Sequence, residues 1–181
     1  MDIGRRHDAT GRSTGVIANS RRRKQNRPPA DQPWIWLTRE LLTSPAWRAL
    51  TENGRKIIDR ILIEHMVHGG GENGNLAVTY ADFVAHGIRR NSILPAICET
   101  EALGLIERQA GLRARSQFKG SPQRFRIAWL PTSEGKAASS GWRAIRTLRE
   151  ATEIVTAARK VGVDSRRQRA PARDQASQEY R

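Results

Sequence analysis

The stretch HGIRRNSILPAICETEALGLIER, residues 86–108, decides how the rest of the sequence is interpreted. Its apolar residues recur at the spacing of one helix face, which predicts a helix over about 91–103 with that face in a core. Gly104 ends this helix and Gly87 ends the one before it, because glycine accepts the left-handed conformation of a helix end. The inner face is formed by Ile93, Ala96, Ile97, Thr100 and Leu103.

Polar residues stand at the start of the predicted helix. It begins at Asn91 or at Ser92, and Arg89 and Arg90 precede it. With Ser92 as the cap, Pro95 is the third helical residue and loses no hydrogen bond, because the first N–H groups of a helix have no partner within it. These polar residues are not needed for the buried face, so they are free for a partner outside the core.

Four elements are expected before the helix over 91–103. A short helical region lies in LTRELLTSPAWRAL (37–50), with Ser44 as a cap. A helix over about 52–67 carries its apolar residues at the i, i+4 spacing of one buried face. LAVT (76–79) has the length of a short strand, and a brief helix over about 80–85 follows it.

Two strands are expected after the helix over 91–103. Leu105 and Ile106 begin the first, and Phe125, Ile127 and Trp129 alternate in the return strand, the pattern of a half-buried strand. Helix, helix, short strand, helix, turn, helix and hairpin is the order of a winged helix-turn-helix. The predicted fold class is therefore mainly α with a small β-hairpin (α+β), with a C-terminal helix and disordered basic termini.

The sequence divides into four segments. Residues 1–33 lack apolar periodicity and hold eight basic and three acidic side chains, which predicts a disordered basic arm. Residues 34–130 are the predicted winged helix-turn-helix domain. Residues 131–161 are expected to hold a linker and a C-terminal helix over about 148–161, and residues 162–181 a disordered tail.

The chain is strongly basic, with 32 Lys and Arg against 18 Asp and Glu and a formal net charge of +14. Such a charge favours polyanionic partners: DNA, RNA or an acidic membrane surface. The four segments carry +5, +4, +3 and +2, so no one segment accounts for the total. Between Arg108 and Leu130 six basic residues occur without an acidic one, which favours contact with a polyanion over a solvated hairpin.

In a helix-turn-helix the second helix enters the major groove by its amino-terminal end, while its apolar side faces the core. The DNA-contacting residues predicted at that end are Arg89, Arg90, Asn91 and Ser92. Arginine pairs with guanine, and asparagine with adenine, through two hydrogen bonds. Leu94 is expected on the outer face, as a contact to a thymine methyl group or as an exposed leucine. The predicted backbone contacts of the hairpin are Arg113, Arg115, Lys119 and Arg124.

Three segments together resemble a family of small bacterial winged helix proteins: LTRELLTSPAWRALTENGRKIIDRI, HMVHGGGENGNLAVTYADF and GIRRNSILPAICETEALGLIE. The family occurs in alphaproteobacterial genomes and is similar to helix-turn-helix proteins of phages and plasmids. The resemblance covers about 34–130 and implies DNA binding in regulation or replication, without catalytic residues. Arg90 and Asn91 match positions that face DNA in such folds. Arg89 stands where many members have a Ser or Thr cap, and Thr100 where they often have Leu.

Other kinds of site find little support in the sequence. His65 and His68 are three residues apart, whereas a zincin needs two histidines four apart around a glutamate, so no metal site or cofactor is expected. Cys98 has no histidine pattern nearby and is interpreted as a partly buried thiol. HGGGENGN (68–75) lacks the Lys-Ser/Thr of a P-loop. The carboxylates are scattered over predicted helix surfaces, so no enzyme is expected.

The sequence also predicts where the protein acts. No apolar run approaches the roughly 20 residues that span a bilayer, and the amino-terminal residues lack the apolar core of a signal peptide. One cysteine allows no internal disulfide. We therefore expect a cytoplasmic, nucleoid-associated protein without a membrane partner.

The leading hypothesis is a sequence-specific double-stranded DNA-binding protein, acting as a transcriptional regulator or a mobile-element accessory factor. The alternatives are a plasmid- or phage-type replication initiation protein and a winged-helix protein-interaction scaffold that does not read DNA. RNA binding in place of duplex DNA also stays open. For the C-terminal helix, one expectation is a homodimer through residues 148–161, and the other is packing on its own domain.

Overall fold

The structure, a computed structural model, describes residues 31–109 and 122–169, with side chains as far as residue 165. These residues form six α-helices, a short 3-10 helix and one antiparallel sheet of three strands. The predicted mixture of α and β structure is confirmed. The predicted disorder of residues 1–30 and 170–181 falls outside the described residues.

Three helices come first, and a hydroxyl side chain caps each of them. They are α2 (Arg39–Thr43), α3 (Pro45–Arg48) and α4 (Glu52–Val67). In each case the capping oxygen accepts a hydrogen bond of 3.2 Å from a backbone N–H three residues on, which satisfies one of the free donors of the helix start. The caps are Thr38, Ser44 and Thr51. The bounds predicted for the helix over 52–67 are confirmed.

The sheet contains β1 (Leu76–Val78), β2 (Ile106–Arg108) and β3 (Gln123–Ile127). Its strand order is β1-β3-β2, with both pairs antiparallel. The central strand β3 pairs Phe125 with Leu76 on one side and Ile127 with Ile106 on the other. These four side chains are buried, so the two strands of the hairpin and the earlier β1 share one core.

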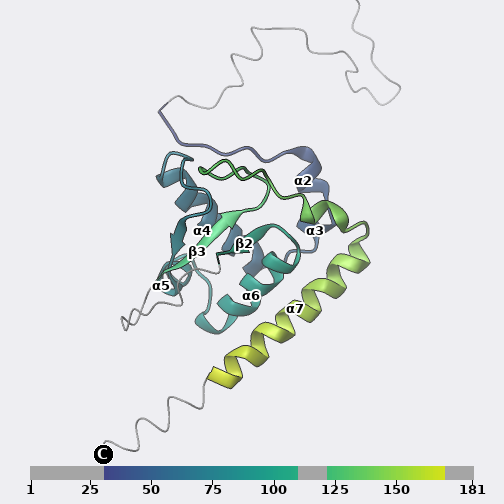
Figure 1. The fold of residues 1–181 in the computed structure, drawn as a ribbon. Coiled ribbons are helices and arrows are strands. Elements are labelled where there is room, and N and C mark those ends of the chain that lie inside the picture. Colours follow the sequence, from purple (N-terminus) through teal and green to yellow (C-terminus); the bar gives the residue numbers. More distant parts are fainter. Residues whose placement is uncertain (1–30, 110–121, 170–181) are drawn as a thin grey trace, which may run out of the picture. The chain divides into compact units, whose positions relative to one another are not determined.

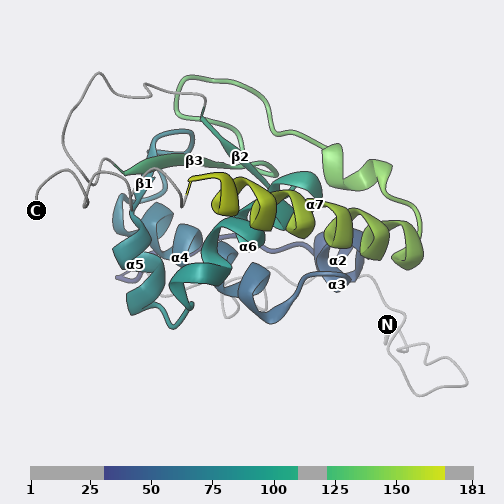
Figure 2. The ribbon, with the colours of Figure 1, turned by 90° about the horizontal axis from the view of Figure 1, so that it is seen from below.

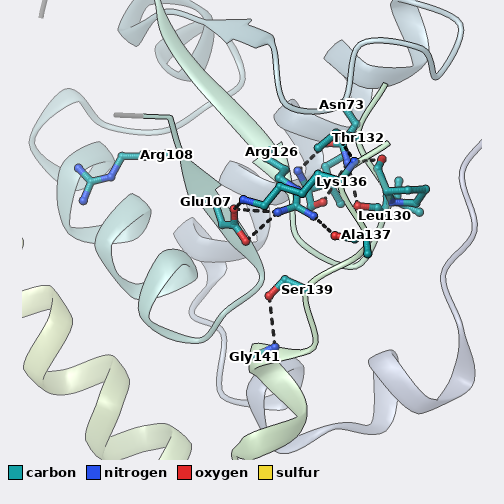
Figure 3. Close-up of polar contacts among 12 residues, drawn as sticks. Asn73, Glu107, Arg108, Arg126, Leu130, Thr132, Lys136, Ala137, Ser139 and Gly141 are labelled. Atoms are coloured by element: carbon teal, nitrogen blue, oxygen red, sulfur yellow. Dashed lines mark hydrogen bonds and ion pairs between the residues drawn. The ribbon is translucent and has the colours of Figure 1, made fainter. Parts of the chain in front are cut away.

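The buried side chain of Asn73 fixes the chain at the end of β3 (Figure 3). Its Nδ2 donates to the carbonyl oxygens of Ile127, Leu130 and Pro131 at 2.9–3.1 Å, and its Oδ1 accepts from the N–H of Ile127 at 2.8 Å. One amide therefore satisfies backbone groups that the sheet leaves unpaired, and buried polar groups are costly without such partners.

Two helices joined by four residues follow β1. They are α5 (Tyr80–Ala85) and α6 (Arg90–Ala102). α5 begins with a capping box, in which Thr79 and Asp82 exchange hydrogen bonds. The turn contains Gly87 at φ +86°, a conformation that side-chain-bearing residues rarely adopt. α5 and α6 are therefore two helices joined by a short turn that contains a glycine.

The C-terminal helix is longer than predicted. It is α7 (Leu148–Arg169), so residues 162–169 of the predicted tail are helical. A 3-10 helix, Gly141–Ala144, precedes it and buries Trp142. α7 lies alongside α6 in both ribbon views (Figures 1 and 2), and its buried residues Ala151 and Val155 belong to the main core cluster.

The described residues from Pro33 onward form one compact unit. The C-terminal helix is therefore part of the domain rather than a segment that follows it. Of the two expectations for this helix, packing on its own domain is the one observed, and its apolar face is used within the chain. None of the described helices is long and apolar enough to cross a bilayer.

Candidate nucleic-acid interface

The start of α6 lies one to two residues earlier than predicted. Arg90 is the first helical residue, and Arg89 occupies the cap position without a side-chain hydrogen bond. Ser92 is therefore a residue of the first turn, so the expectation that it caps the helix is wrong. Pro95 is the sixth residue of α6, inside the helix, so it removes a donor that an interior turn would use.

The first turn of α6 is open to solvent and positively charged. Arg89, Arg90 and Asn91 are exposed, and Ser92 is partly exposed. Neither arginine forms an ion pair or side-chain hydrogen bond with another described residue. The structure thus places these four predicted contact residues together at one helix end, with both guanidinium groups available.

The start of α6 differs in charge from the starts of most other helices of the domain, although the four-residue α3 also has no acidic residue in its first turn. An acidic residue lies in the first turn of α2, α4, α5 and α7, where a negative charge is stabilised by the positive end of the helix dipole. The first turn of α6 has no acidic residue and instead begins with Arg89 and Arg90. The dipole and the two cations reinforce each other, so this end attracts an anion.

The remaining turns of α6 are covered on both sides. Ile93, Ala96 and Ile97 are fully buried in the core, as predicted. Leu94, expected on the outer face as a DNA contact, is only 9% exposed, so that expectation is wrong. The cause is α7, which packs against the face of α6 that points away from the core.

Gly162 marks the closest approach of the two helices. A Cβ atom at this position would lie 2.7 Å from the Cα of Pro95 and 3.3 Å from the Sγ of Cys98. Both neighbours lie on the outward face of α6, and the first is backbone that cannot turn aside. Glycine therefore allows α7 to lie directly on α6. Burial raises the pKa of the Cys98 thiol, which is half-buried between the helices.

A buried carboxylate connects α4, α6 and α7. The side chain of Glu99 is fully buried, and its Oε1 accepts from the N–H of Thr51 at 2.9 Å and from the hydroxyl of Thr51 at 2.7 Å. Its Oε2 accepts from Nη1 of Arg159 at 2.6 Å. Gly54 leaves the room for this carboxylate, because a Cβ there would lie 2.1 Å from Oε1. We call these three side chains, Thr51, Glu99 and Arg159, the Glu99 network.

The hairpin carries less free charge than the sequence suggested. Arg108 forms an ion pair with Glu101, with Nε 2.7 Å from Oε2. Arg126 is 1% exposed and pairs with both oxygens of Glu107, at 3.0 and 3.2 Å. Two of the six basic residues between Arg108 and Leu130 are therefore neutralised by glutamates that precede this stretch.

Figure 3 shows how Arg126 is held at the base of the hairpin. Its guanidinium lies between Glu107 and the carbonyl oxygen of Ala137, to which Nη2 donates. Lys136 adds a second cation at 3.6 Å from Glu107. Arg108 points away from this group in the figure. Arg126 therefore joins the strand to the segment before α7 and is not available to a ligand.

Of the predicted hairpin contacts, Arg124 is exposed on β3 and forms no ion pair with another described residue. Arg113, Arg115 and Lys119 lie outside the described residues. Arg124 pairs in register with Ala77 of β1. It therefore remains a candidate contact.

Sequence reasoning missed the Glu99 network and the buried role of Arg126. The sequence held a signal for the covered outer face of α6, because positions outside the predicted inner face include the apolar residues Leu94, Pro95 and Cys98. A helix with apolar residues on every side is buried on every side. The pairing of Arg126 with Glu107 followed only from the strand register.

Other candidate sites remain structural. His65 is buried on α4, and burial lowers the pKa of its imidazole. Among the residues that the structure describes, no group of three or more His, Cys, Asp and Glu side chains could hold a metal ion. No family model, curated protein or solved structure matches the chain.

Proposed function

We propose that the protein binds double-stranded DNA through a winged helix-turn-helix, with α6 as the recognition helix. The observation that carries the proposal is the open first turn of α6. Arg89 and Arg90 lie at the positive end of a helix dipole with no acidic residue in that turn. A phosphate or the acceptor edge of a guanine removes this unfavourable accumulation of positive charge.

The topology supports the same proposal. Helix α4, strand β1, helices α5 and α6, and the pair β2 and β3 follow one another in the order of a winged helix, with β1 beside β3. The segment 110–121 connects β2 to β3 in the sequence, which is where a winged helix carries its wing. It contains Arg113, Arg115 and Lys119, and the exposed Arg124 follows it. With six to eight phosphate contacts, log K would fall with log salt at a slope of roughly −5 to −7.

The covered face of α6 restricts how such a helix reads DNA. The major groove is about 12 Å wide and admits one helix, whereas α6 and α7 lie side by side (Figure 2). Base contacts therefore come from the first turn, entered end-on, and Asn91 and Arg90 are the residues for them. The cellular role we propose is that of a transcriptional regulator or a mobile-element accessory factor.

The test is binding to duplexes selected from random genomic fragments, measured by fluorescence anisotropy. Arg90→Ala with Asn91→Ala should reduce discrimination between the selected and a scrambled duplex by about 1–3 kcal/mol per lost base contact. The matched control is Arg39→Ala with Arg48→Ala, because both arginines are exposed on other helices and without ion pairs to described residues.

Equal affinity and equal selectivity of the parent and the α6 variant would refute the recognition role. Absence of salt-sensitive duplex binding by the parent would refute DNA binding and favour a protein-interaction scaffold. Tighter binding to a structured RNA than to any duplex would replace DNA by RNA as the ligand. Footprints on origin repeats rather than on promoters would identify a replication initiation protein.

A further inference from the structure

α7 runs antiparallel to α6, and three contacts set the direction. A Cβ at Gly104, just after α6, would lie 2.8 Å from the backbone N of Trp142, just before α7. Arg159 bonds to Glu99 in the middle, and Gly162 meets Pro95 nearer the start of α6. Residue numbers along α7 therefore increase in the direction in which those along α6 decrease.

The same contacts fix α7 in place. Trp142 and Ile145 are 3% and 7% exposed in front of the helix, and Ala151 and Val155 are buried in the core cluster. Arg159 is tied to the Glu99 network, and Gly162 is in contact with backbone. Release of α7 would expose Leu94, Pro95 and Cys98 to water. These contacts hold α7 beside the end of the domain at which α6 begins.

The carboxyl-terminal turns of α7 extend past the start of α6. Seven helical residues follow Gly162, a length of about 10 Å, whereas Pro95 lies five residues after Arg90, a length of about 7.5 Å. The backbone of residues 167–169 is therefore level with Arg89 and Arg90 or beyond them. Both views show the end of α7 beside α6 (Figures 1 and 2).

The sequence of this end is strongly basic. From Lys160 to Arg169 there are four basic residues and one acidic residue, Asp164. Lys160 and Asp164 are exposed, and neither forms an ion pair with another described residue. The backbone of the last turn of α7 is level with Arg89 and Arg90, and its sequence contains Arg166, Arg167 and Arg169.

We propose that the last turn of α7 and the first turn of α6 form one DNA-contacting surface, in which the arginines of α7 bind the phosphate backbone beside the groove that α6 enters. The inference rests on the proposed function and assigns α7 the role of a phosphate clamp. It gives a reason for the length of α7 beyond Gly162. A duplex fits this surface because its phosphates continue on both sides of the groove.

The experiment measures the salt dependence of binding to a 20-base-pair duplex by fluorescence anisotropy. The variant R166Q/R167Q/R169Q keeps residues that favour a helix and should reduce the magnitude of the log–log slope by about 2–3, roughly one per lost phosphate contact. The control R39Q/R48Q/R146Q removes three exposed arginines at the opposite end of α7 and on α2 and α3, and should change the slope by less than about 1.

Two further arms separate charge from helix stability. Cations stabilise an exposed helix C-terminus only weakly, so circular dichroism should show a thermal midpoint for the triple glutamine variant that is close to that of the parent. The variant R166K/R167K/R169K should keep the parent slope, because a phosphate contact needs charge and not a guanidinium. If the lysine variant shows the same reduced slope of log K against log salt as the glutamine variant, the inference is overturned.

The outcomes distinguish this inference from the proposed function. If R89Q/R90Q lowers affinity and R166Q/R167Q/R169Q behaves like the control, the clamp is wrong and the recognition helix stands. If the parent shows no salt-sensitive duplex binding, the proposed function fails first. Weakened binding in both variants, with a parent-like slope in the lysine variant, is the expected result.

Discussion

The first turn of α6 differs in charge and in burial from the turns that follow it. The first turn is exposed, carries Arg89 and Arg90, and has no acidic residue. The later turns are covered by the core on one side and by α7 on the other, and even Glu99 is fully buried. In α6, the proposed recognition helix, only the charged first turn is therefore open to a ligand, and the rest of the helix packs within the domain.

Removal of the cation from the Glu99 network should have the largest effect on stability. Arg159→Met leaves the buried Glu99 carboxylate without its counter-charge, and breaking a buried pair in this way costs about 3–5 kcal/mol. Chemical denaturation followed by tryptophan fluorescence measures the loss. Arg149→Met is the control, because the side chain of Arg149 is 90% exposed.

A double variant sharpens this prediction. Replacing both partners by apolar residues, Glu99→Met with Arg159→Met, removes the uncompensated charge and should recover part of the stability. The recovery will be incomplete, because Glu99 also accepts two hydrogen bonds from Thr51. If the single and double variants unfold at the same denaturant concentration, Glu99 is not held as a buried carboxylate.

The contrast between the two parts of α6 predicts opposite phenotypes for neighbouring substitutions. Leu94→Ala should cost about 2–3 kcal/mol of stability, because a buried leucine is lost. It should leave the preference between duplexes unchanged. Asn91→Ala should change stability by less than about 0.5 kcal/mol and alter that preference. A stable Leu94→Ala protein with altered base preference would place Leu94 in the groove after all.

Substitution of Gly162 should have a smaller effect on stability. Alanine favours a helix by up to about 1 kcal/mol over glycine, yet its Cβ would lie 2.7 Å from the backbone of Pro95. We expect Gly162→Ala to be destabilising by about 1–2 kcal/mol because overpacking outweighs propensity. Val161→Ala, at a position 61% exposed, is the control. A higher thermal midpoint for Gly162→Ala would show that α7 does not lie so close to α6.

The smallest expected effect is the dependence of stability on pH through His65. Burial lowers the pKa of His65 below its ordinary value of 6.5, so the unfolded chain binds the proton first as pH falls. His65 therefore favours unfolding progressively from about pH 6.5 down to its lowered folded pKa. Thermal midpoints at pH 7.5 and 5.5 should differ more for the parent than for His65→Leu. Equal differences would contradict a buried neutral imidazole.

Much of the domain could be predicted because its signals are local. Ser44 caps its helix as expected, and Gly87 and Gly104 follow the ends of α5 and α6 as expected. The open first turn was also predicted, since Arg89 and Arg90 lie outside any apolar pattern. The α+β class followed from the order of these elements.

The rest depended on contacts between distant segments. The partner of Glu99 is 60 residues away on α7, and the partner of Arg126 lies across a strand pair. A charge count along the sequence cannot show which arginines are neutralised in this way. Leu94 was misplaced for the same reason, because its covering helix begins after a linker that looked like the end of the domain.

The most direct test of the account is hydrogen exchange of the backbone amides with and without a selected 20-base-pair duplex. The account predicts increased protection at the turn and first residues of α6, 88–92, while the amides of residues 151–162 in α7 keep the protection that they have without DNA. Loss of protection along 151–162 on binding would contradict it, because α6 would then enter the groove with the face that α7 covers.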